Sequence, residues 1–481
     1  MSKIKFHKGG DIPLELHRVR IVQKINLLPI DERLEAIKKA DYNTYNLESK
    51  DVFLDMLTDS GTNAMSDVQL GAMMTADDAY AGSQTYYKLC KAVEDVIGKK
   101  YTLPVHQGRA AENVLARTFV KEGDIIPMNY HFGSTISHIG LAGGTHAEML
   151  YANAFESEST NQFKGNVEID KLIACIEKHG ADKIPFIRME ASTNLIGGQP
   201  FSVENYLKVR DVATKYKIKL VLDASLLGEN ALLVKQREEK YANCKLGEII
   251  MKICDAADIV YFSARKLTSS KGGAICSNDR TTIKQMEAVV GLFEGYVTSG
   301  GISMNEMESM AVGLYETLDE NVISQSPSYI KYFVEEAVKR GIPMITPPGV
   351  LGAHIDARRF CAHLPKEEYQ AAALASALYI TSGVRAMEGG SVSEVNPNNP
   401  NYYADMELVR LAFPRRVFTL SQTLYALDRL EWLYENKNLI GGMKFIDVPG
   451  FNHNFRSPLA PLSDWPNKLI AKFKKDFGDS L

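Results

Sequence analysis

The chain lacks several features that mark specialised classes of protein. Its 481 residues contain only six cysteines, none spaced as Cys-x-x-Cys, and we interpret them as reduced thiols. No apolar run approaches the roughly 20 residues that a membrane-spanning helix needs. The N-terminal residues 1–13 lack the apolar core of a signal peptide. We therefore expect a cytoplasmic protein without a membrane partner.

A strong charge of one sign is also missing. The 55 basic residues nearly balance the 59 acidic ones, and the net charge of −4 argues against nucleic acid as the main partner. The composition, 45% apolar and 24% charged, is that of a globular protein. Because 481 residues are too many for one ordinary core, we expect two domains.

Helix and strand signals alternate through the middle of the chain. Residues 171–179 place Leu172, Ile173 and Ile176 on one helical face, which ends at Gly180, and Ser202 can cap a following helix. Short apolar segments predict strands at 184–190, 218–225, 258–263 and 273–277. This alternation predicts an α/β fold with a mostly parallel sheet and helices on both faces.

The pattern changes after about residue 320. A helix is predicted from Ser326 and Pro327 to Gly341, and a strand at 408–413 follows a polar loop. We expect an N-terminal arm at 1–56 that contributes to the small domain or to a partner subunit. The large domain should cover 57–320, and a smaller α+β domain 321–481.

Two charged residues stand at the ends of predicted strands: the second strand ends at Asp223, and Lys266 comes just after the third. Ligands of parallel sheets bind beyond the carboxyl ends of the strands, so these residues could share a site. A lysine amine can form a Schiff base with an aldehyde, and an aspartate can keep a pyridine nitrogen protonated. Together they are the two anchors of pyridoxal phosphate. Residues 106–119 offer a glycine loop that opens a helix, which suits a phosphate.

Longer motifs carry a family resemblance. They are LTDSGTNAMSD (57–67), DDAYAGS (77–83), PVHQGRAAEN (104–113), TNLIGGQP (193–200), DIVYFSARK (258–266) and VRLAFPRRVFT (409–419). In this order they strongly resemble the tryptophanase/tyrosine phenol-lyase family, whose members are pyridoxal-phosphate-dependent β-eliminating lyases of the aspartate-aminotransferase fold type. The resemblance extends from about residue 20 to about residue 450.

The resemblance implies roles for individual residues. Lys266 matches the Schiff-base lysine, Asp223 the pyridinium partner, and Tyr80 the acid that protonates the leaving group. Further cofactor contacts are implied for Gln107, Gly108, Arg109, Phe132, Asn194, Ser263 and Arg265. Substrate contacts are implied for Ser60, Gly133, Asn194, Gly389 and Arg410, with Arg410 on the α-carboxylate. The implied assembly is a homotetramer of dimers that share active sites.

The implied reaction begins when an amino acid displaces Lys266. The freed lysine, or water, removes the α-proton while the cofactor ring stores the electrons. Protonation of the leaving group then yields pyruvate and ammonia. Two alternatives stay open: the same cofactor could serve β-substitution, transamination or aldol-type cleavage, or the chain could be a non-catalytic binding or assembly protein. The presence of the whole catalytic set counts against the second.

Several positions depart from the family pattern. Leu226 stands where the family has an arginine near the ring hydroxyl. Gly133 and Gly389 stand where tyrosine phenol-lyases have the threonine and arginine that bind the phenol oxygen. We therefore expect tyrosine to be a poor substrate, because a site without those polar partners loses discrimination. His453 could match a histidine near the C-terminus of tryptophanases, but the tail aligns poorly with the family, which favours a surface residue.

A monovalent-cation position is also altered. Relatives bind the ion through positions that match Gly61, Lys271 and Asp78, where the family has an asparagine at Lys271 and a glutamate at Asp78. In one hypothesis the Lys271 amine replaces or neighbours a potassium ion and pairs with Asp78 of the partner subunit. In the alternative, Lys271 points to solvent.

Overall fold

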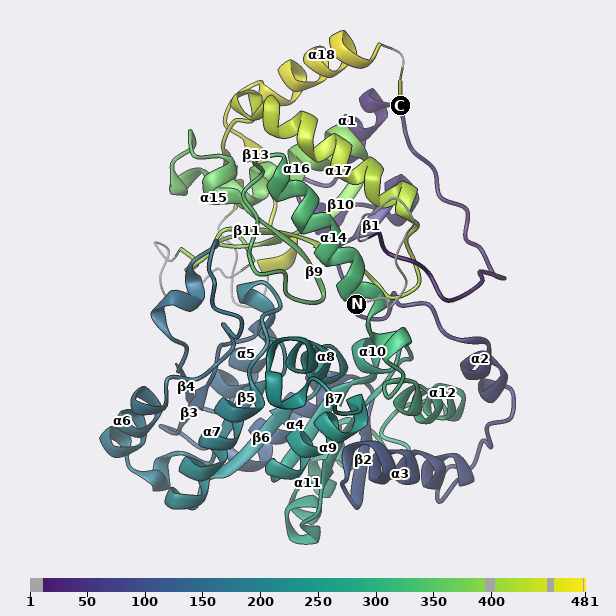
Figure 1. The fold of residues 1–481 in the computed structure, drawn as a ribbon, viewed down its shortest axis with the longest axis vertical. Coiled ribbons are helices and arrows are strands. Elements are labelled where there is room, and N and C mark those ends of the chain that lie inside the picture. Colours follow the sequence, from purple (N-terminus) through teal and green to yellow (C-terminus); the bar gives the residue numbers. More distant parts are fainter. Residues whose placement is uncertain (1–11, 394–402, 448–453, 479) are drawn as a thin grey trace. The chain divides into compact units, whose positions relative to one another are not determined.

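The computed structural model describes residues 12–393, 403–447, 454–478 and 480–481 (Figure 1). The chain divides into two compact units. Unit 1 comprises the described residues within Met1–Asp59, Phe155–Thr160 and Ser326–Leu481. Unit 2 comprises Ser60–Ala154 and Asn161–Gln325. In the part of the chain that the structure describes, no helix is both long and apolar enough to cross a membrane.

Unit 2 is built on a seven-stranded sheet of order β2-β8-β7-β6-β5-β3-β4. Its strands are β2 (Tyr101–Val105), β3 (Ile125–Met128), β4 (Thr145–Glu148), β5 (Phe186–Glu190), β6 (Lys219–Asp223), β7 (Ile259–Ser263) and β8 (Gly273–Ser277). Only β8 runs against the others. The predicted α/β class with a mostly parallel sheet is confirmed, and the four predicted strands are β5 to β8.

Both faces of this sheet are buried, because alternate side chains of each strand enter different cores. Leu220 and Leu222 of β6 join one apolar cluster, whereas Val221 joins the other. The helices of unit 2 are α2 (Asp67–Met73), α3 (Gln84–Ile97), α4 (Gly108–Phe119), α5 (Gly133–Leu141), α6 (Ile169–His179), α7 (Val203–Tyr216), α8 (Leu227–Arg237), α9 (Leu246–Ala256), α10 (Ala264–Leu267), α11 (Arg280–Phe293), α12 (Met304–Glu316) and α13 (Glu320–Ile323).

The helix boundaries follow the predicted signals. Gly180 follows α6 directly, with a φ of +85° that L-residues rarely adopt. The Ser202 hydroxyl accepts a hydrogen bond from the backbone N–H of Asn205 and caps α7, as predicted.

Unit 1 contains a four-stranded sheet of order β1-β10-β11-β9 and a two-stranded sheet of β12 and β13. The strands are β1 (Leu54–Met56), β9 (Gly352–Asp356), β10 (Val384–Gly389), β11 (Leu408–Ala412), β12 (Met443–Phe445) and β13 (Leu459–Pro461). The helices are α1 (Ile30–Lys39), α14 (Gln325–Lys339), α15 (Ala357–Phe360), α16 (Gln370–Ser382), α17 (Leu420–Glu435) and α18 (Trp465–Phe477). The predicted strand at 408–413 and the predicted helix before Gly341 correspond to β11 and α14.

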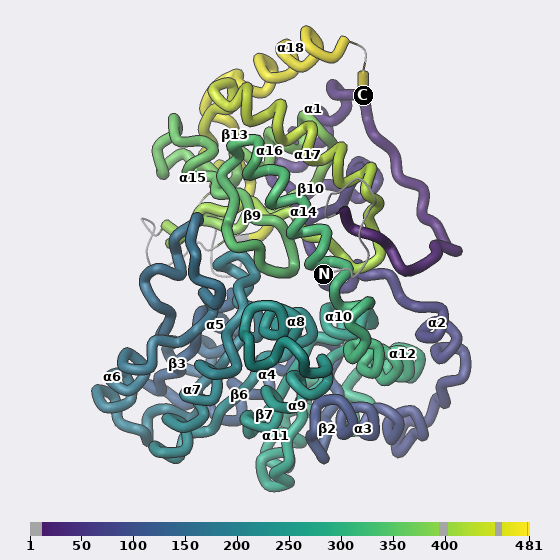
Figure 2. Tube along the Cα trace, viewed as in Figure 1, coloured from purple at the N-terminus to yellow at the C-terminus, as the bar shows by residue number. Residues whose placement is uncertain are grey.

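Distant parts of the sequence meet in unit 1. Helix α16 is buried along its whole length, and α1 from the N-terminal segment packs against α16 and α18 (Figure 2). The N-terminal segment also adds β1 to the sheet, beside β10. Residues 155–160 belong to this unit as well, and the N–H of Thr346 donates to the carbonyl of Ser157 over 2.8 Å.

Candidate active site

The parallel strands of unit 2 share one carboxyl edge. Because β2, β3, β5, β6 and β7 all run in the same direction, the segments that follow them open at the same side of the sheet. The residues matched to cofactor contacts occupy these segments: Gln107, Gly108 and Arg109 after β2, Phe132 after β3, Asn194 after β5, Asp223 at the end of β6, and Ser263, Arg265 and Lys266 at the end of β7.

The two lysines of the segment after β7 have different surroundings. Lys266 lies on α10, and its amine is 5.4 Å from the centroid of the Phe132 ring. Lys271 has a side chain that is 60% exposed, and its amine lies 3.6 Å from a carboxylate oxygen of Glu306. An amine beside an aromatic ring at the sheet edge suits a covalent bond to a planar cofactor, which favours Lys266 over Lys271.

The start of α4 lies close to the end of β7. A Cβ atom on Gly108 would be only 2.8 Å from the Cβ of Ser263, so this approach requires glycine. The Gln107 side chain does not cap the helix, and the first backbone N–H groups of α4 can therefore serve an anion. Arg109 adds a guanidinium to this first turn. Together these groups fit the phosphate of the cofactor.

Arg265 lies over the segment that begins unit 2. Its backbone carbonyl accepts a hydrogen bond from the N–H of Gly61 over 2.9 Å, and its guanidinium contacts the carbonyl of Ser60 at 3.5 Å. A Cβ atom on Gly61 would meet this guanidinium at 2.5 Å. The substrate position Ser60 and the cation position Gly61 are therefore held beside the lysine-bearing segment.

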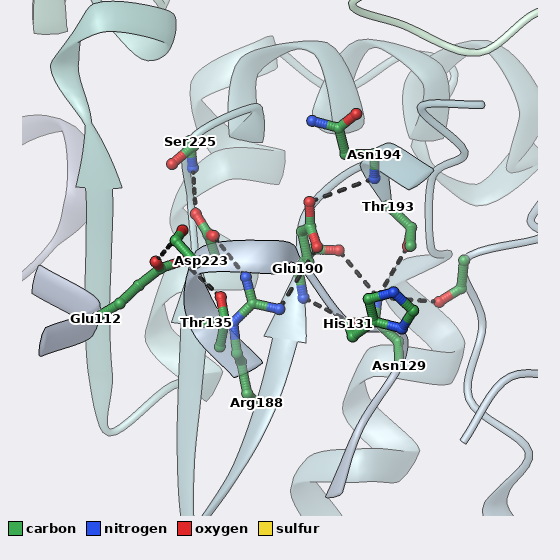
Figure 3. A network of polar contacts seen from close by, with 12 residues as sticks. Glu112, Asn129, His131, Thr135, Arg188, Glu190, Thr193, Asn194, Asp223 and Ser225 are labelled. Carbon is green, nitrogen blue, oxygen red and sulfur yellow. Dashed lines mark hydrogen bonds and ion pairs between the residues drawn. The ribbon is translucent and has the colours of Figure 1, made fainter. Parts of the chain in front are cut away.

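Asp223 is the centre of a buried polar network (Figure 3). One of its carboxylate oxygens accepts hydrogen bonds from Arg188 over 2.8 Å and from the Tyr261 hydroxyl over 3.0 Å. The other accepts the backbone N–H of Ser225 over 3.0 Å. Arg188 is 1% exposed and Asp223 6%. A buried carboxylate needs such a counter-charge, because isolated charges are costly in the protein interior.

Two further acids surround the same guanidinium. A Glu190 oxygen lies 3.5 Å from Arg188, and Glu112 accepts hydrogen bonds from Ser134 and Thr135. Burial raises the pKa of Glu190 to about 7, although Arg188 opposes the shift, and burial also raises the pKa of Glu112. Two carboxyl groups with raised pKa values therefore lie in the same network as the residue matched to the pyridinium partner.

Sequence reasoning missed Arg188, Glu190, Glu112 and Tyr261. A signal was present in the segment FIRME, because Arg188 and Glu190 are alternate residues of an apolar strand and so share one buried face. Leu226, which stands at the family arginine position, is buried at the start of α8. The site nevertheless contains a buried guanidinium, which β5 supplies and which binds Asp223.

Unit 1 carries two of the residues matched to substrate recognition, Gly389 and Arg410. Arg410 on β11 is buried and donates a hydrogen bond to the carbonyl of Leu57 over 2.9 Å. Burial lowers its pKa. On the neighbouring strand His354 stands opposite Arg410, and burial together with that guanidinium lowers the pKa of His354 to about 3. Gly389 ends β10, where a Cβ atom would make only an ordinary contact with Leu408. His453 lies outside the described residues.

Tyr80 and Gly133, both in unit 2, are open to their surroundings. The Tyr80 side chain is 76% exposed, and its ring lies 5.2 Å from that of Tyr296. Gly133 begins α5, and a Cβ atom there would meet nothing within 4 Å. Within a single chain, Tyr80 is therefore in contact with water, not enclosed.

Comparison with known proteins decides the family. A family model described as β-eliminating lyase matches residues 55–428. The chain belongs to the β-eliminating lyase family. It is 38% identical over 452 residues to a tyrosine phenol-lyase of Symbiobacterium thermophilum, which covers 93% of this chain and 99% of that protein. It is 37% identical over 446 residues to one of Nostoc punctiforme, which covers 92% of this chain and 96% of that protein.

Solved structures agree on the fold of the lyase. Serine palmitoyltransferase of Sphingomonas wittichii aligns with a TM-score of 0.55 at 12% identity, over 81% of this chain and 88% of that one. An aromatic aminotransferase of Pyrococcus horikoshii aligns with a TM-score of 0.58 at 12% identity, over 85% and 99%. The expected fold type I and the expected β-lyase family are confirmed. The lyase is a pyridoxal-phosphate-dependent enzyme, and Lys266, Asp223 and the glycine-opened α4 fit that cofactor.

Proposed function

We propose that the lyase converts a β-substituted L-amino acid to pyruvate, ammonia and a released leaving group. The observation that carries this proposal is the Lys266 amine beside the Phe132 ring, at the same sheet edge as the buried Asp223 carboxylate. The membership in the β-eliminating lyase family supports the reaction class.

The chain's own residues divide the work. Lys266 would hold the cofactor aldehyde covalently, and its amine, once free, would remove the α-proton of the amino acid. Asp223 would hold the ring nitrogen protonated, and Arg188 supplies the counter-charge for that carboxylate. The first turn of α4 with Arg109 binds the phosphate. When bound, pyridoxal phosphate supplies the electron sink that makes the α-proton acidic.

The substrate is proposed to differ from that of the named relatives. Gly133 and Gly389 offer no side chain to a phenol oxygen, and the Cβ of either residue would have room. Arg410 is proposed to bind the α-carboxylate, since a guanidinium matches a carboxylate with two parallel hydrogen bonds. We therefore expect release of pyruvate from other β-substituted amino acids to exceed that from tyrosine.

We further propose a cytoplasmic homotetramer whose dimers share active sites. Tyr80 is exposed in the single chain, whereas an acid for the leaving group acts best where water is excluded. A partner subunit that covers Tyr80 would exclude that water, which supports a shared site. At the matched cation position, the Lys271 amine lies 3.6 Å from Glu306. This contact supports an ion pair within one chain, in place of a pair with Asp78 of the partner subunit. If Lys271 replaces potassium, activity should hardly depend on that ion.

The direct test is covalent trapping of the cofactor. Borohydride reduction should fix pyridoxal phosphate to the wild-type lyase and to Lys271→Ala, but not to Lys266→Ala. Lys271→Ala is the matched control because the two lysines lie five residues apart in one segment. Trapping on Lys266→Ala would contradict the assignment. A screen of β-substituted amino acids for pyruvate and ammonia then separates β-elimination from β-substitution, transamination and aldol-type cleavage.

A further inference from the structure

Three potential metal ligands meet at the edge of the large sheet. His146 and Glu148 are alternate residues of the edge strand β4, so their side chains leave the same face. His131 follows the neighbouring strand β3, which pairs in parallel with β4 so that Met128 stands opposite Glu148. The backbone pairing therefore brings the two imidazoles and the carboxylate together.

The ligand atoms are close enough to share one ion. One nitrogen or oxygen from each of His131, His146 and Glu148 lies within 4.8 Å of the others. Nδ1 of His131 is hydrogen-bonded to the Glu148 carboxylate, and Nε2 of His146 lies 3.7 Å from the same oxygen. Tetrahedral zinc with bonds of about 2.1 Å holds its ligand atoms roughly 3.4 Å apart. To bind zinc, the hydrogen-bonded His131–Glu148 pair would open to this distance, and the widest separation in the cluster, which is at most 4.8 Å, would close by up to about 1.4 Å.

The surroundings leave one side of the cluster open. The His131 side chain is 6% exposed, whereas those of His146 and Glu148 are 33% and 26% exposed. An ion can enter from the His146 side, and water can serve as a fourth ligand. None of the three residues is among those matched to cofactor or substrate contacts.

We propose that His131, His146 and Glu148 bind a divalent transition-metal ion, with Zn²⁺ the best match. Two imidazoles and one carboxylate form a ligand set that zinc accepts, and their single negative charge balances part of the charge of the ion. The ion would tie β4 to the segment after β3. Because His131 precedes Phe132, the same ion would fix the backbone that carries the residue matched to ring stacking.

The test uses Co²⁺ as a spectroscopic probe on tag-free holoenzyme from which metals have been removed. One equivalent per chain should give the strong visible absorption of four-coordinate Co²⁺, and Zn²⁺ should displace it. His146→Gln and Glu148→Gln should each weaken Zn²⁺ binding by about 100-fold or more, because even the loss of an outer-shell partner costs about 10–100-fold. Isothermal titration with Zn²⁺ measures this.

His106→Gln is the matched control. His106 also pairs with a carboxylate, that of Glu294, but is not part of this three-residue group. The His106→Gln variant should therefore bind Zn²⁺ as the wild type does. The proposal fails if wild-type protein binds less than one equivalent, or if all three variants bind alike. X-ray absorption of the zinc-loaded wild type gives an answer that needs no variant: two imidazoles in the shell support the site, and none or one rejects it.

Discussion

The most consequential single residue outside the predicted set is Arg188. Its guanidinium is enclosed by Asp223, Glu190 and Tyr261, and it is the cation that Asp223 contacts directly. The family arginine at the position of Leu226 is matched to the side of the ring hydroxyl, whereas Arg188 binds Asp223, the acid that we propose as the partner of the ring nitrogen. We therefore expect the proton balance of the bound cofactor to depend on Arg188.

Replacement of Arg188 tests this dependence. Arg188→Met leaves the Asp223 carboxylate buried without its cation, which costs about 3–5 kcal/mol when one partner of a buried pair is removed. We expect a lower unfolding temperature, a pyridoxal-phosphate Kd raised by an order of magnitude or more, and an altered pH profile of cofactor absorbance. Arg210→Met is the control. Arg210 pairs with Asp258 over 2.7 Å, but this pair is partly exposed, and its loss should cost less. Equal effects of the two variants would contradict the role of Arg188.

Glu388 makes stability depend on pH. Burial and the neighbouring Glu407 raise its pKa from 4.5 to about 8. The folded chain therefore holds this proton more tightly than the unfolded chain, and the contribution of Glu388 to the unfolding free energy falls as pH rises from 4.5 to about 8. Glu388→Gln cannot ionise, so the loss of unfolding free energy over this range should shrink by up to about 5 kcal/mol. Denaturant unfolding of apoprotein at several pH values gives the slope, and an unchanged slope would refute the assignment.

At the scale of elements, the start of α4 depends on a close approach to β7. An alanine at Gly108 would press its Cβ to 2.8 Å from that of Ser263, so the helix start must move away from the end of the strand. The N–H groups that face the phosphate move with it, and we expect Gly108→Ala to weaken cofactor binding by roughly tenfold. Gly140→Ala on α5 has open space around its Cβ and should bind normally. Absorbance titration with pyridoxal phosphate compares the two.

The elements also show how far sequence analysis can reach. Strands β5 to β8 were predictable because strands buried on both faces form short continuous apolar runs. Edge strand β4 has the sequence THAE and no apolar run, so neither the strand nor the contact of its histidine with His131 could be expected. The full set of cofactor residues was predicted from the motif resemblance. Arg188, the partner of Asp223, was not predicted, because the pairing of β5 with β6 decides which buried charges meet.

At the scale of the whole molecule, the predicted catalytic set is spread over separate parts of the chain. Lys266, Asp223 and Tyr80 belong to unit 2, whereas Arg410 belongs to unit 1. Tyr80 is exposed to solvent in the single chain, and Asp78 lies in the same loop before α3. Asp78 was matched to a cation ligand from a neighbouring subunit, and Tyr80 to the acid for the leaving group. The proposed homotetramer with shared sites would enclose Tyr80.

A mixing experiment tests the shared site. Tyr80→Phe and Lys266→Ala should each be nearly inactive toward a substrate whose leaving group needs a proton. If Tyr80 serves the Lys266 of the partner subunit, each mixed dimer regains one intact site, and random pairing in equal amounts restores about a quarter of all sites. If both residues serve the same chain, mixing restores nothing. The variants are unfolded and refolded together, with pyruvate release as the measure, and Lys266→Ala mixed with Asp223→Ala is the control that must stay inactive. Activity near zero in the first mixture, with hybrids confirmed by mass spectrometry, would overturn the shared site.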